Sequence, residues 1–379
     1  MKEFLFIKKV LVLSLLAFVF SALQCGNTSN SSETIKPEPS KPTLDELIGE
    51  MIIIGIDGTQ LSQTPAVKKY LAAGNLGGII LYEKNIAKTN SKVTLKTLCN
   101  EIQSQSNKTV FIGIDQEGGT VNRLKTKYGF PKSVTAKYLG ELNNVDSSKA
   151  YAQTMAKTIK ELGINVNFTP CVDLCSNPNN PIIAKYGRCY SDNPQIVATH
   201  AGIFSETLFE NNILPVLKHF PGHGSSKGDT HLGMADVTEV WTENELVPYR
   251  ALIKKDLAQA IMSAHIINAK LDPDTLPSTL SKPILTGMLR NDLGFKGVIF
   301  SDDMQMRAIS DHYGLENAIL MAVNAGIDVL MFSGNIPGTE TPTIERVFAT
   351  FNKLIEEGKI SEKRLLESYE RIQAVKSKL

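Results

Sequence analysis

Eight short apolar runs, separated by stretches with helical periodicity, constrain the fold of this 379-residue chain most strongly. The runs are Met51–Ile56, Gly77–Tyr82, Val110–Asp115, Asn165–Pro170, Ile213–Phe220, Ala260–His265, Gly297–Asp303 and Asp328–Gly334. Continuously apolar strands that alternate with helices indicate a parallel sheet covered by helices. Eight such units predict a single (β/α)8 barrel. A doubly wound open sheet is the alternative, but the first run is not followed by a glycine-rich nucleotide loop.

Amphipathic stretches between the runs, such as Lys149–Leu162 and Gln195–Asn211, predict the covering helices. After the last run, the residues from Asn352 onward predict two more helices. Ser361 is placed to cap the second of them.

Ionisable side chains stand at the ends of four of the runs. They are Asp115, Lys218 with His219, His265, and Asp302 with Asp303. Catalytic groups of such barrels lie at the carboxyl ends of the strands. Charges there are costly unless they are paired or used, so the sequence predicts one active site at this end.

The segment KHFPGHGSSKGDTH, residues 218–231, holds three of the six histidines. Pro221 and the glycines after it argue against the helix that would bring His219 and His223 to one metal ion. The glycine spacing also differs from that of phosphate-binding loops. Proton transfer remains, because Asp229 could orient the imidazole of His231; an incidental surface pair is the alternative.

Other residues of this region have expected structural roles. We expect His223 to shape the loop through hydrogen bonds. We expect His265 to be a core histidine, with a place in the lining of the site as the alternative. The small residues in the middle of the loop should give it freedom to move. They are Gly222, Gly224, Ser225, Ser226 and Gly228.

The N-terminus has the layout of a secretory signal peptide, predicted over residues 1–24. Three lysines precede the apolar run Val10–Phe20, which is shorter than the roughly 20 residues of a membrane span. Cys25 stands where bacterial lipoproteins carry a lipid, so membrane attachment through Cys25 is expected. Simple secretion or an uncleaved anchor are the alternatives. Residues 25–42 predict a flexible linker, and residues 43–379 one domain.

Composition excludes some functions and leaves others open. With 40 basic and 39 acidic side chains, the net charge of +1 gives no reason to expect nucleic acid as a partner. The four remaining cysteines, Cys99, Cys171, Cys175 and Cys189, could form disulfides in an exported protein. The sequence does not assign a pairing, and buried free thiols are the preferred interpretation.

Three motifs together resemble glycoside hydrolase family 3, and more narrowly its bacterial β-N-acetylglucosaminidase (β-hexosaminidase) branch. They are KHFPGHG followed by DTH, DQEGG at Asp115–Gly119, and GFKGVIFSDDM at Gly294–Met304. The similarity extends from LDELIGEMIIIGI near residue 44 to EGKISEKRLLES near the C-terminus. It implies a (β/α)8 barrel, a carbohydrate substrate, a retaining mechanism, and neither cofactor nor metal.

The resemblance also implies the catalytic residues. Asp302 is similar in position to the family's nucleophile, and Asp303 would then have a structural role, such as capping the next helix. His231, supported by Asp229, would be the general acid and base. Relatives that act on glucosides often take a glutamate from a second domain, which we do not expect here.

The sugar-binding residues implied by the resemblance are Asp115, Arg123, Arg188, Lys218 and His219. A surface salt bridge is the alternative for Arg188. The chain departs from the family where DQEGGRV reads DQEGGTV, with Thr120 in place of an arginine, and a hydroxyl cannot replace a bidentate cation.

The expected function is release of terminal N-acetylglucosamine from glycans outside the cytoplasm, such as peptidoglycan or chitin fragments. A β-glucosidase and a phosphorylase on the same fold are the enzymatic alternatives. A sugar-binding lipoprotein is the alternative without catalysis.

Overall fold

Eight parallel strands close into a barrel in the order β1-β10-β9-β7-β5-β4-β3-β2. The strands are β1 Ile52–Gly55, β2 Gly78–Leu81, β3 Phe111–Ile114, β4 Val166–Asn167, β5 Leu214–Phe220, β7 Ala260–Ser263, β9 Val298–Asp303 and β10 Val329–Phe332. Each lies within one of the eight predicted runs, so the predicted (β/α)8 barrel is confirmed.

The computed structural model describes residues 41–379. The predicted signal peptide, Cys25 and all but the last two residues of the predicted linker therefore lie outside the described residues.

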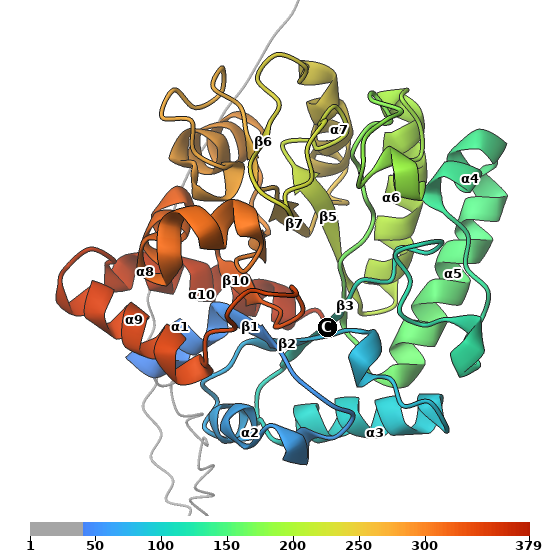
Figure 1. Ribbon diagram of the computed structural model, residues 1–379. Coiled ribbons are helices and arrows are strands. Elements are labelled where there is room, and N and C mark those ends of the chain that lie inside the picture. Colours follow the sequence, from blue (N-terminus) through green and yellow to red (C-terminus); the bar gives the residue numbers. More distant parts are fainter. Residues whose placement is uncertain (1–40) are drawn as a thin grey trace, which may run out of the picture. The chain divides into compact units, whose positions relative to one another are not determined.

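Helices form a ring around the strands (Figure 1). They are α1 Leu44–Glu50, α2 Pro65–Ala72, α3 Ser91–Ser104, α4 Ala136–Leu142, α5 Val145–Leu162, α6 Pro194–Glu210, α7 Val247–Lys254, a π-helix Pro283–Asp292, α8 Arg307–Ala325, α9 Ile344–Glu356 and α10 Glu362–Lys376. Ser361 caps α10 as predicted, since its hydroxyl accepts a hydrogen bond from the Arg364 amide at 3.2 Å.

Aromatic side chains fill the barrel. The ring of Phe300 on β9 lies 5.8 Å from that of Phe111 on β3 and 5.6 Å from that of Phe168, all three fully buried. Gly113 makes room for this packing, because a Cβ there would stand 2.8 Å from the Phe168 ring.

A buried ionic network closes the amino-terminal end of the barrel. The carboxylate of Asp328, which precedes β10, accepts hydrogen bonds from Arg290 at 2.5 Å and Arg371 at 3.0 Å. The Ser368 hydroxyl and the Ile299 amide donate to it at 2.7 and 3.0 Å. Asp328 has no exposed surface, so this network serves the fold.

Long loops follow the strands at the opposite, carboxyl end of the barrel. The loop after β5 ends in a short strand, β6 Ala235–Asp236, which pairs in parallel with β8 Ile266–Ile267. This pairing ties the β5 loop to the segment after β7, so both are held over the end of the barrel.

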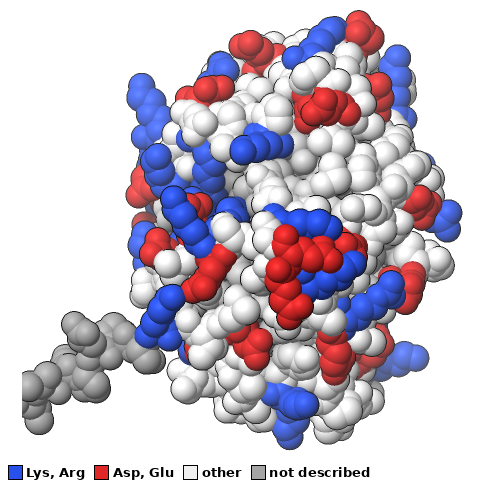
Figure 2. All heavy atoms as spheres, turned by 90° about the vertical axis from the view of Figure 1, so that its left-hand side faces the viewer, with Lys and Arg blue, Asp and Glu red and all other residues white. Residues whose placement is uncertain are grey.

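The surface drawn in Figure 2 mixes acidic and basic side chains, with no large patch of one sign. This distribution agrees with the balanced composition. Among the described residues, no helix has the length and apolar character that crossing a bilayer requires.

Candidate active site

A cleft of about 640 Å³ opens at the carboxyl ends of the strands. It brings together all eight of the predicted site residues that the structure describes. They are Asp115, Arg123, Arg188, Lys218, His219, Asp229, His231 and Asp302. The cleft is therefore the candidate active site.

One wall of the cleft is built on a network of five charged side chains from strand β5 and the loops after β3 and β4. Lys218 Nζ, at the end of β5, lies 2.8 Å from Asp115 Oδ1 and 2.7 Å from Glu117 Oε1. Arg123 contacts Asp115 at 3.2 Å, and Arg188 bonds both oxygens of Glu117, at 2.9 and 2.8 Å. The alternating charges fix one another, so the wall is rigid before any ligand arrives.

The charge pairs keep both carboxylates ionised. Burial would raise the pKa of Glu117, but Arg188 and Lys218 outweigh it and lower that pKa to about 2. Burial acts likewise on Asp115, where Lys218 and Arg123 hold the pKa well below its usual value. The wall therefore offers fixed donors and acceptors at any pH near neutrality.

Arg188 is not the surface salt bridge of the alternative interpretation. Its side chain is only 11% exposed, and its Nη2 lies 3.2 Å from Nε2 of His219. Its partner Glu117 was not singled out from the sequence. The signal that could have found it is the second carboxylate of the DQEGG motif, two residues after Asp115.

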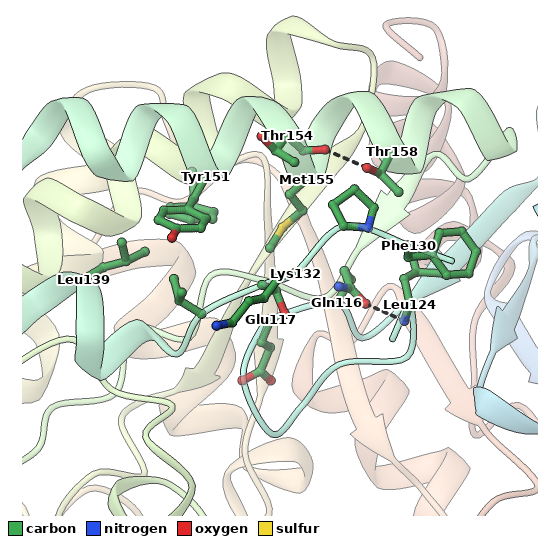
Figure 3. Close-up of a pocket in the computed structure, with 14 residues that line it drawn as sticks. Gln116, Glu117, Leu124, Phe130, Lys132, Leu139, Tyr151, Thr154, Met155 and Thr158 are labelled. Atoms are coloured by element: carbon green, nitrogen blue, oxygen red, sulfur yellow. Dashed lines mark hydrogen bonds between the residues drawn. The ribbon is translucent and has the colours of Figure 1, made fainter. Parts of the chain in front are cut away.

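Gln116 holds the hairpin that presents Arg123 to the cleft. Its side-chain oxygen accepts hydrogen bonds from the amides of Arg123 and Leu124, both at 3.0 Å. Figure 3 shows the bond between Gln116 and Leu124. Thr120, in place of the family's arginine, stands exposed at the tip of this hairpin and does not line the cleft. The difference from the family at Thr120 therefore lies outside the network of charged side chains that faces the cleft.

Figure 3 also shows a small cavity behind this loop, where Tyr151, Thr154, Met155 and Thr158 of α5 face it. Glu117 belongs to the lining of this cavity and not to that of the cleft. It therefore supports the charged wall from behind.

Asp173 fixes His219 and was missed by the sequence reasoning. This fully buried carboxylate lies 2.6 Å from His219 Nδ1 and accepts the backbone amides of His219 and His223, at 3.1 and 2.7 Å. An aspartate three residues after Pro170, in the loop beyond β4, carried no motif that would have revealed it. The bond to Nδ1 leaves His219 Nε2 facing Arg188 and the cleft.

Cys171, Asp173 and His219 could share a metal ion, since their ligand atoms all lie within 4.8 Å of one another. The local charges disfavour it, because the Arg188 guanidinium contacts His219. Burial and the nearby Asp173 also raise the pKa of the Cys171 thiol far above its usual value, and the thiol donates to Asp173.

The adjacent carboxyls of Asp302 and Asp303 at the end of β9 have opposite environments. Burial would raise the pKa of Asp302, but the imidazoles of His265, His219 and His231 outweigh it, so that pKa lies below its usual value. Burial, aided by repulsion from Asp302, instead raises the pKa of Asp303 to about 6. Asp302 is thus the carboxylate that is ionised beside the cleft floor.

Asp303 is structural, though not as a cap of α8. Its carboxylate accepts the amides of Gln305 at 3.1 Å and Ser333 at 3.3 Å, and the Ser333 hydroxyl. Helix α8 starts only at Arg307. Asp303 therefore joins the end of β9 to the loop after β10, and the predicted capping role is wrong.

His265 is the buried core histidine that the sequence predicted. Its Nδ1 lies 2.8 Å from the Thr279 hydroxyl and its Nε2 2.9 Å from the carbonyl oxygen of Asp303.

Asp229 and His231 lie together on the far side of the cleft. His231 Nδ1 is 2.8 Å from Asp229 Oδ1, which also accepts the His231 amide at 2.9 Å. The imidazole is half exposed, at 49%, unlike the buried His219. Since Nδ1 faces Asp229, the other nitrogen is the one available for proton transfer.

The β5 loop is anchored where we expected it to move. Gly222, Gly224, Ser225 and Ser226 are all buried. A Cβ at Gly224 would stand 1.9 Å from the Leu174 carbonyl oxygen, so glycine is needed there for close approach. Gly222 packs against Glu245 and Gly224 against the loop after β4, so the expected freedom to move stays a prediction for Gly228, which is half-buried.

Glu245 strengthens this anchor. Its carboxylate accepts the amides of Leu174 at 3.3 Å and Ser225 at 3.0 Å, and the Ser176 hydroxyl at 3.1 Å. It thereby joins the loops after β4 and β5 at the base of the segment that carries His231. Nothing in the sequence around Glu245 distinguished it from a surface residue.

His223 contributes through its backbone and not through its ring. Its amide donates to Asp173 and its carbonyl accepts from Asn180 at 2.8 Å. Within residues 41–379 both ring nitrogens are buried without a partner, and burial lowers the pKa of His223 to about 4. The prediction that His223 shapes the loop through hydrogen bonds is therefore confirmed for its backbone, while its ring makes none.

The four cysteines within residues 41–379 divide into two classes. Cys99 and Cys171 are buried free thiols, as preferred from the sequence, but Cys175 and Cys189 form a disulfide. The free-thiol prediction is therefore wrong for these two. The disulfide closes the β4 loop directly beside Arg188.

A closed (β/α)8 barrel with a carboxylate, an aspartate-backed histidine and a polar cleft has the make-up of a barrel glycoside hydrolase. The Glycosyl hydrolase family 3 N terminal domain matches residues 43–375. The chain therefore belongs to this family, as the motifs indicated.

Two relatives and one solved structure illustrate the similarity. The chain is 33% identical over 336 residues to beta-hexosaminidase A of Pseudoalteromonas piscicida, covering 83% of this chain but 55% of the relative. It is 33% identical over 290 residues to a beta-hexosaminidase of Xanthomonas axonopodis pv. citri (strain 306), covering 74% of this chain and 83% of the relative. A family 3 beta-N-acetylglucosaminidase of Paenibacillus sp. str. FPU-7 superposes with a TM-score of 0.81 at 30% identity, covering 89% and 63% of the two chains.

Proposed function

We propose that this protein is a retaining exo-β-N-acetylglucosaminidase that releases terminal N-acetylglucosamine from glycans. The observation that carries the proposal is one cleft containing both an ionised carboxylate, Asp302, and an aspartate-backed histidine, His231. A retaining glycosidase needs a nucleophile and a proton donor in this arrangement. The names of the relatives support hexosamine as the sugar.

In the first step, Asp302 attacks the anomeric carbon and forms a glycosyl ester while the bond to the leaving oxygen breaks. His231 gives its proton to that oxygen, and Asp229 stabilises the imidazolium beforehand and orients the ring. In the second step, a water molecule gives a proton to His231 and attacks the same carbon. This displaces the carboxylate of Asp302 and restores the enzyme.

The charged wall would hold the sugar between these groups. Asp115 can accept hydrogen bonds from hydroxyls, while Arg123, Arg188 and Lys218 can donate them. His219, whose Nε2 accepts from Arg188, lines the same wall. Because the wall is already fixed by its own ion pairs, it orients the ring without reorganisation.

Aryl β-glycosides of N-acetylglucosamine and of glucose, each with and without inorganic phosphate, test the proposal. We expect turnover of the N-acetylglucosaminide, independent of phosphate. Preference for the glucoside would assign a β-glucosidase, and a glycosyl phosphate product would assign a phosphorylase. No turnover of either glycoside would favour the sugar-binding alternative.

The His231→Ala variant tests the acid role. We expect kcat/KM to fall about 10²- to 10⁴-fold for substrates with poor leaving groups, such as a chito-oligosaccharide. For a dinitrophenyl glycoside, whose leaving group needs no proton, kcat/KM should change far less. Equal losses on both substrates would remove His231 from the acid role.

We also propose that the protein is exported and carries a lipid on Cys25. The apolar run Val10–Phe20 and the Cys175–Cys189 disulfide support export, because disulfides persist in oxidising compartments. Cell fractionation tests the anchor: the Cys25→Ala variant should leave the membrane fraction, and its retention there would contradict lipidation at that thiol.

A further inference from the structure

We propose that Arg307 binds an acidic group on the leaving-group side of the cleft, so that the enzyme prefers substrates whose leaving group carries a carboxylate. This inference rests on the proposed function, because it assigns a leaving-group subsite to the same cleft. It concerns a residue outside the catalytic and sugar-binding sets described above.

Arg307 differs from the other arginines and lysines that line the cleft. Arg123, Arg188 and Lys218 each form ion pairs with Asp115 or Glu117. Within residues 41–379, Arg307 has no ion pair or hydrogen bond through its side chain, and it is exposed. Among the described residues it is thus the cleft cation without a direct ion-pair partner.

The sequence around Arg307 offers no structural reason for the charge. Arg307 is the first residue of α8, where the helix dipole disfavours a cation. Asp311, one turn further on, accepts a hydrogen bond from Ser310 and does not pair with Arg307. An unpaired cation at this position adds nothing to the helix, which favours a role in binding.

The backbone places Arg307 beside the proton donor. The amide of its neighbour Ala308 donates to the carbonyl oxygen of Thr230 at 3.3 Å, and Thr230 lies between Asp229 and His231 in the chain. The leaving oxygen must lie at His231 when it receives its proton. A group attached to that oxygen on the same side is therefore within the region that Arg307 faces.

Apolar side chains also line the cleft. Leu232 is 76% exposed and Tyr186 is 41% exposed, and both line the cleft with Ile336 and Pro337. An apolar rim with one uncompensated cation suits a ring that has an apolar face and a carboxylate, which guanidinium can bind through two parallel hydrogen bonds. A neutral chito-oligosaccharide would leave the charge of Arg307 unused.

Two aryl glycosides of N-acetylglucosamine, with 4-carboxyphenyl and 4-carbamoylphenyl leaving groups, test the inference. The measured quantity is the ratio of their kcat/KM values, since comparing this ratio between variants removes intrinsic differences in leaving ability. Arg307→Gln should lower the ratio about tenfold, and Arg307→Glu should lower it further. In the wild type, added salt should lower the ratio towards that of Arg307→Gln.

Arg250→Gln provides the matched control. Arg250 is an exposed arginine of α7 that does not line the cleft, and its partner Glu243 lies 3.7 Å away. This variant changes the net charge equally and should leave the ratio as in the wild type. An Arg307→Gln ratio equal to that of Arg250→Gln would overturn the inference.

Inorganic phosphate is the other anion that Arg307 could bind. Phosphate-stimulated turnover that Arg307→Gln abolishes would also overturn the carboxylate assignment. Affinities of the corresponding non-hydrolysed S-aryl thioglycosides should show the same dependence on Arg307. They test the inference even if turnover, and with it the proposed function, fails.

Discussion

Each end of the barrel holds a network of arginines and carboxylates. The two networks differ in whether their side chains are available to a ligand. At the amino-terminal end, Asp328 has no exposed surface and receives hydrogen bonds from Arg290, Arg371, Ser368 and the Ile299 amide. All the partners of this carboxylate are protein groups. The hydrogen bonds and ion pairs of Asp328 can therefore contribute only to the stability of the folded state.

At the carboxyl end, the network around Asp115 and Glu117 has the same chemistry but an open face. The side chains of Asp115, Arg123 and Arg188 remain 16%, 25% and 11% exposed to the cleft. These ion pairs hold the groups in place and leave part of each for a ligand. The arginines of the two networks are similarly exposed, since Arg290, Arg364 and Arg371 around Asp328 are 12%, 15% and 30% exposed. The comparison therefore teaches that a carboxylate left partly exposed in a cleft, and not the burial of the arginines, separates a binding network from a structural one.

The largest effect is expected from the nucleophile at the open end. Asp302→Ala should lower kcat by about 10⁴-fold or more, because the substitution removes the proposed nucleophile. The side chain accepts a hydrogen bond from the adjacent Asp303 amide, so thermal unfolding should change little. Asp303→Asn is the control, with a lower melting temperature but retained turnover. Reversed outcomes would exchange the roles of the two aspartates.

The second-largest effect is expected from breaking the network around Asp328 at the amino-terminal end of the barrel. Asp328→Ala leaves three partly exposed arginine side chains without their fully buried carboxylate, namely Arg290, Arg364 and Arg371. The free energy of unfolding should fall by about 3–5 kcal/mol in urea titrations. The kcat/KM of the folded fraction should stay within twofold of the wild type. A specific loss of activity would show that the two ends are coupled.

A smaller effect, opposite in kind, is expected from Arg188→Lys in the open network. Lysine keeps the charge but cannot bond both oxygens of Glu117 and also reach His219. We expect kcat/KM to fall about 10- to 100-fold, with little change in unfolding. Arg371→Lys is the matched control at the closed end, where stability should fall and kcat/KM should hold. Similar behaviour of the two variants would remove the distinction between the networks.

The sequence predicted the barrel well because hydrophobic periodicity and strand spacing are local signals. The sequence also predicted that Asp302, Asp229 and His231 lie at one end of the sheet, because each follows an apolar run or lies in a recognisable motif. The contact between Asp229 and His231 spans only two residues, which is why spacing alone could suggest it.

The remaining parts of the site depend on contacts between loops that no local pattern encodes. Asp173 meets His219 across 46 residues, and Glu245 meets Leu174 across 71. The glycines of the β5 loop resembled a flexible segment because their sequence does not show the carbonyl of Leu174 that requires a missing Cβ. The Cys175–Cys189 pairing likewise depended on how the β4 loop folds back.

The last prediction concerns the pH dependence of stability. It extends the comparison to Glu245, a buried carboxyl that has no cationic partner within residues 41–379. Burial, together with repulsion from Asp173, raises the pKa of Glu245 to about 7, against the hydrogen bonds from Leu174, Ser176 and Ser225. The folded protein therefore binds this proton more tightly than the unfolded chain, whose glutamates titrate near pH 4.5. The stabilisation from the bound proton is complete below pH 4.5 and is lost as the pH rises through 7.

Urea unfolding of the wild type and of Glu245→Gln at pH 5 and pH 8 measures this contribution. The wild type should lose about 1–3 kcal/mol more of its unfolding free energy between these pH values than the variant, which has no proton to release. An equal pH dependence of the two proteins would contradict the assignment. Glu245 anchors the base of the loop that carries His231. A change in the protonation of Glu245 should therefore change how firmly this loop is held, although Glu245 does not contact the substrate.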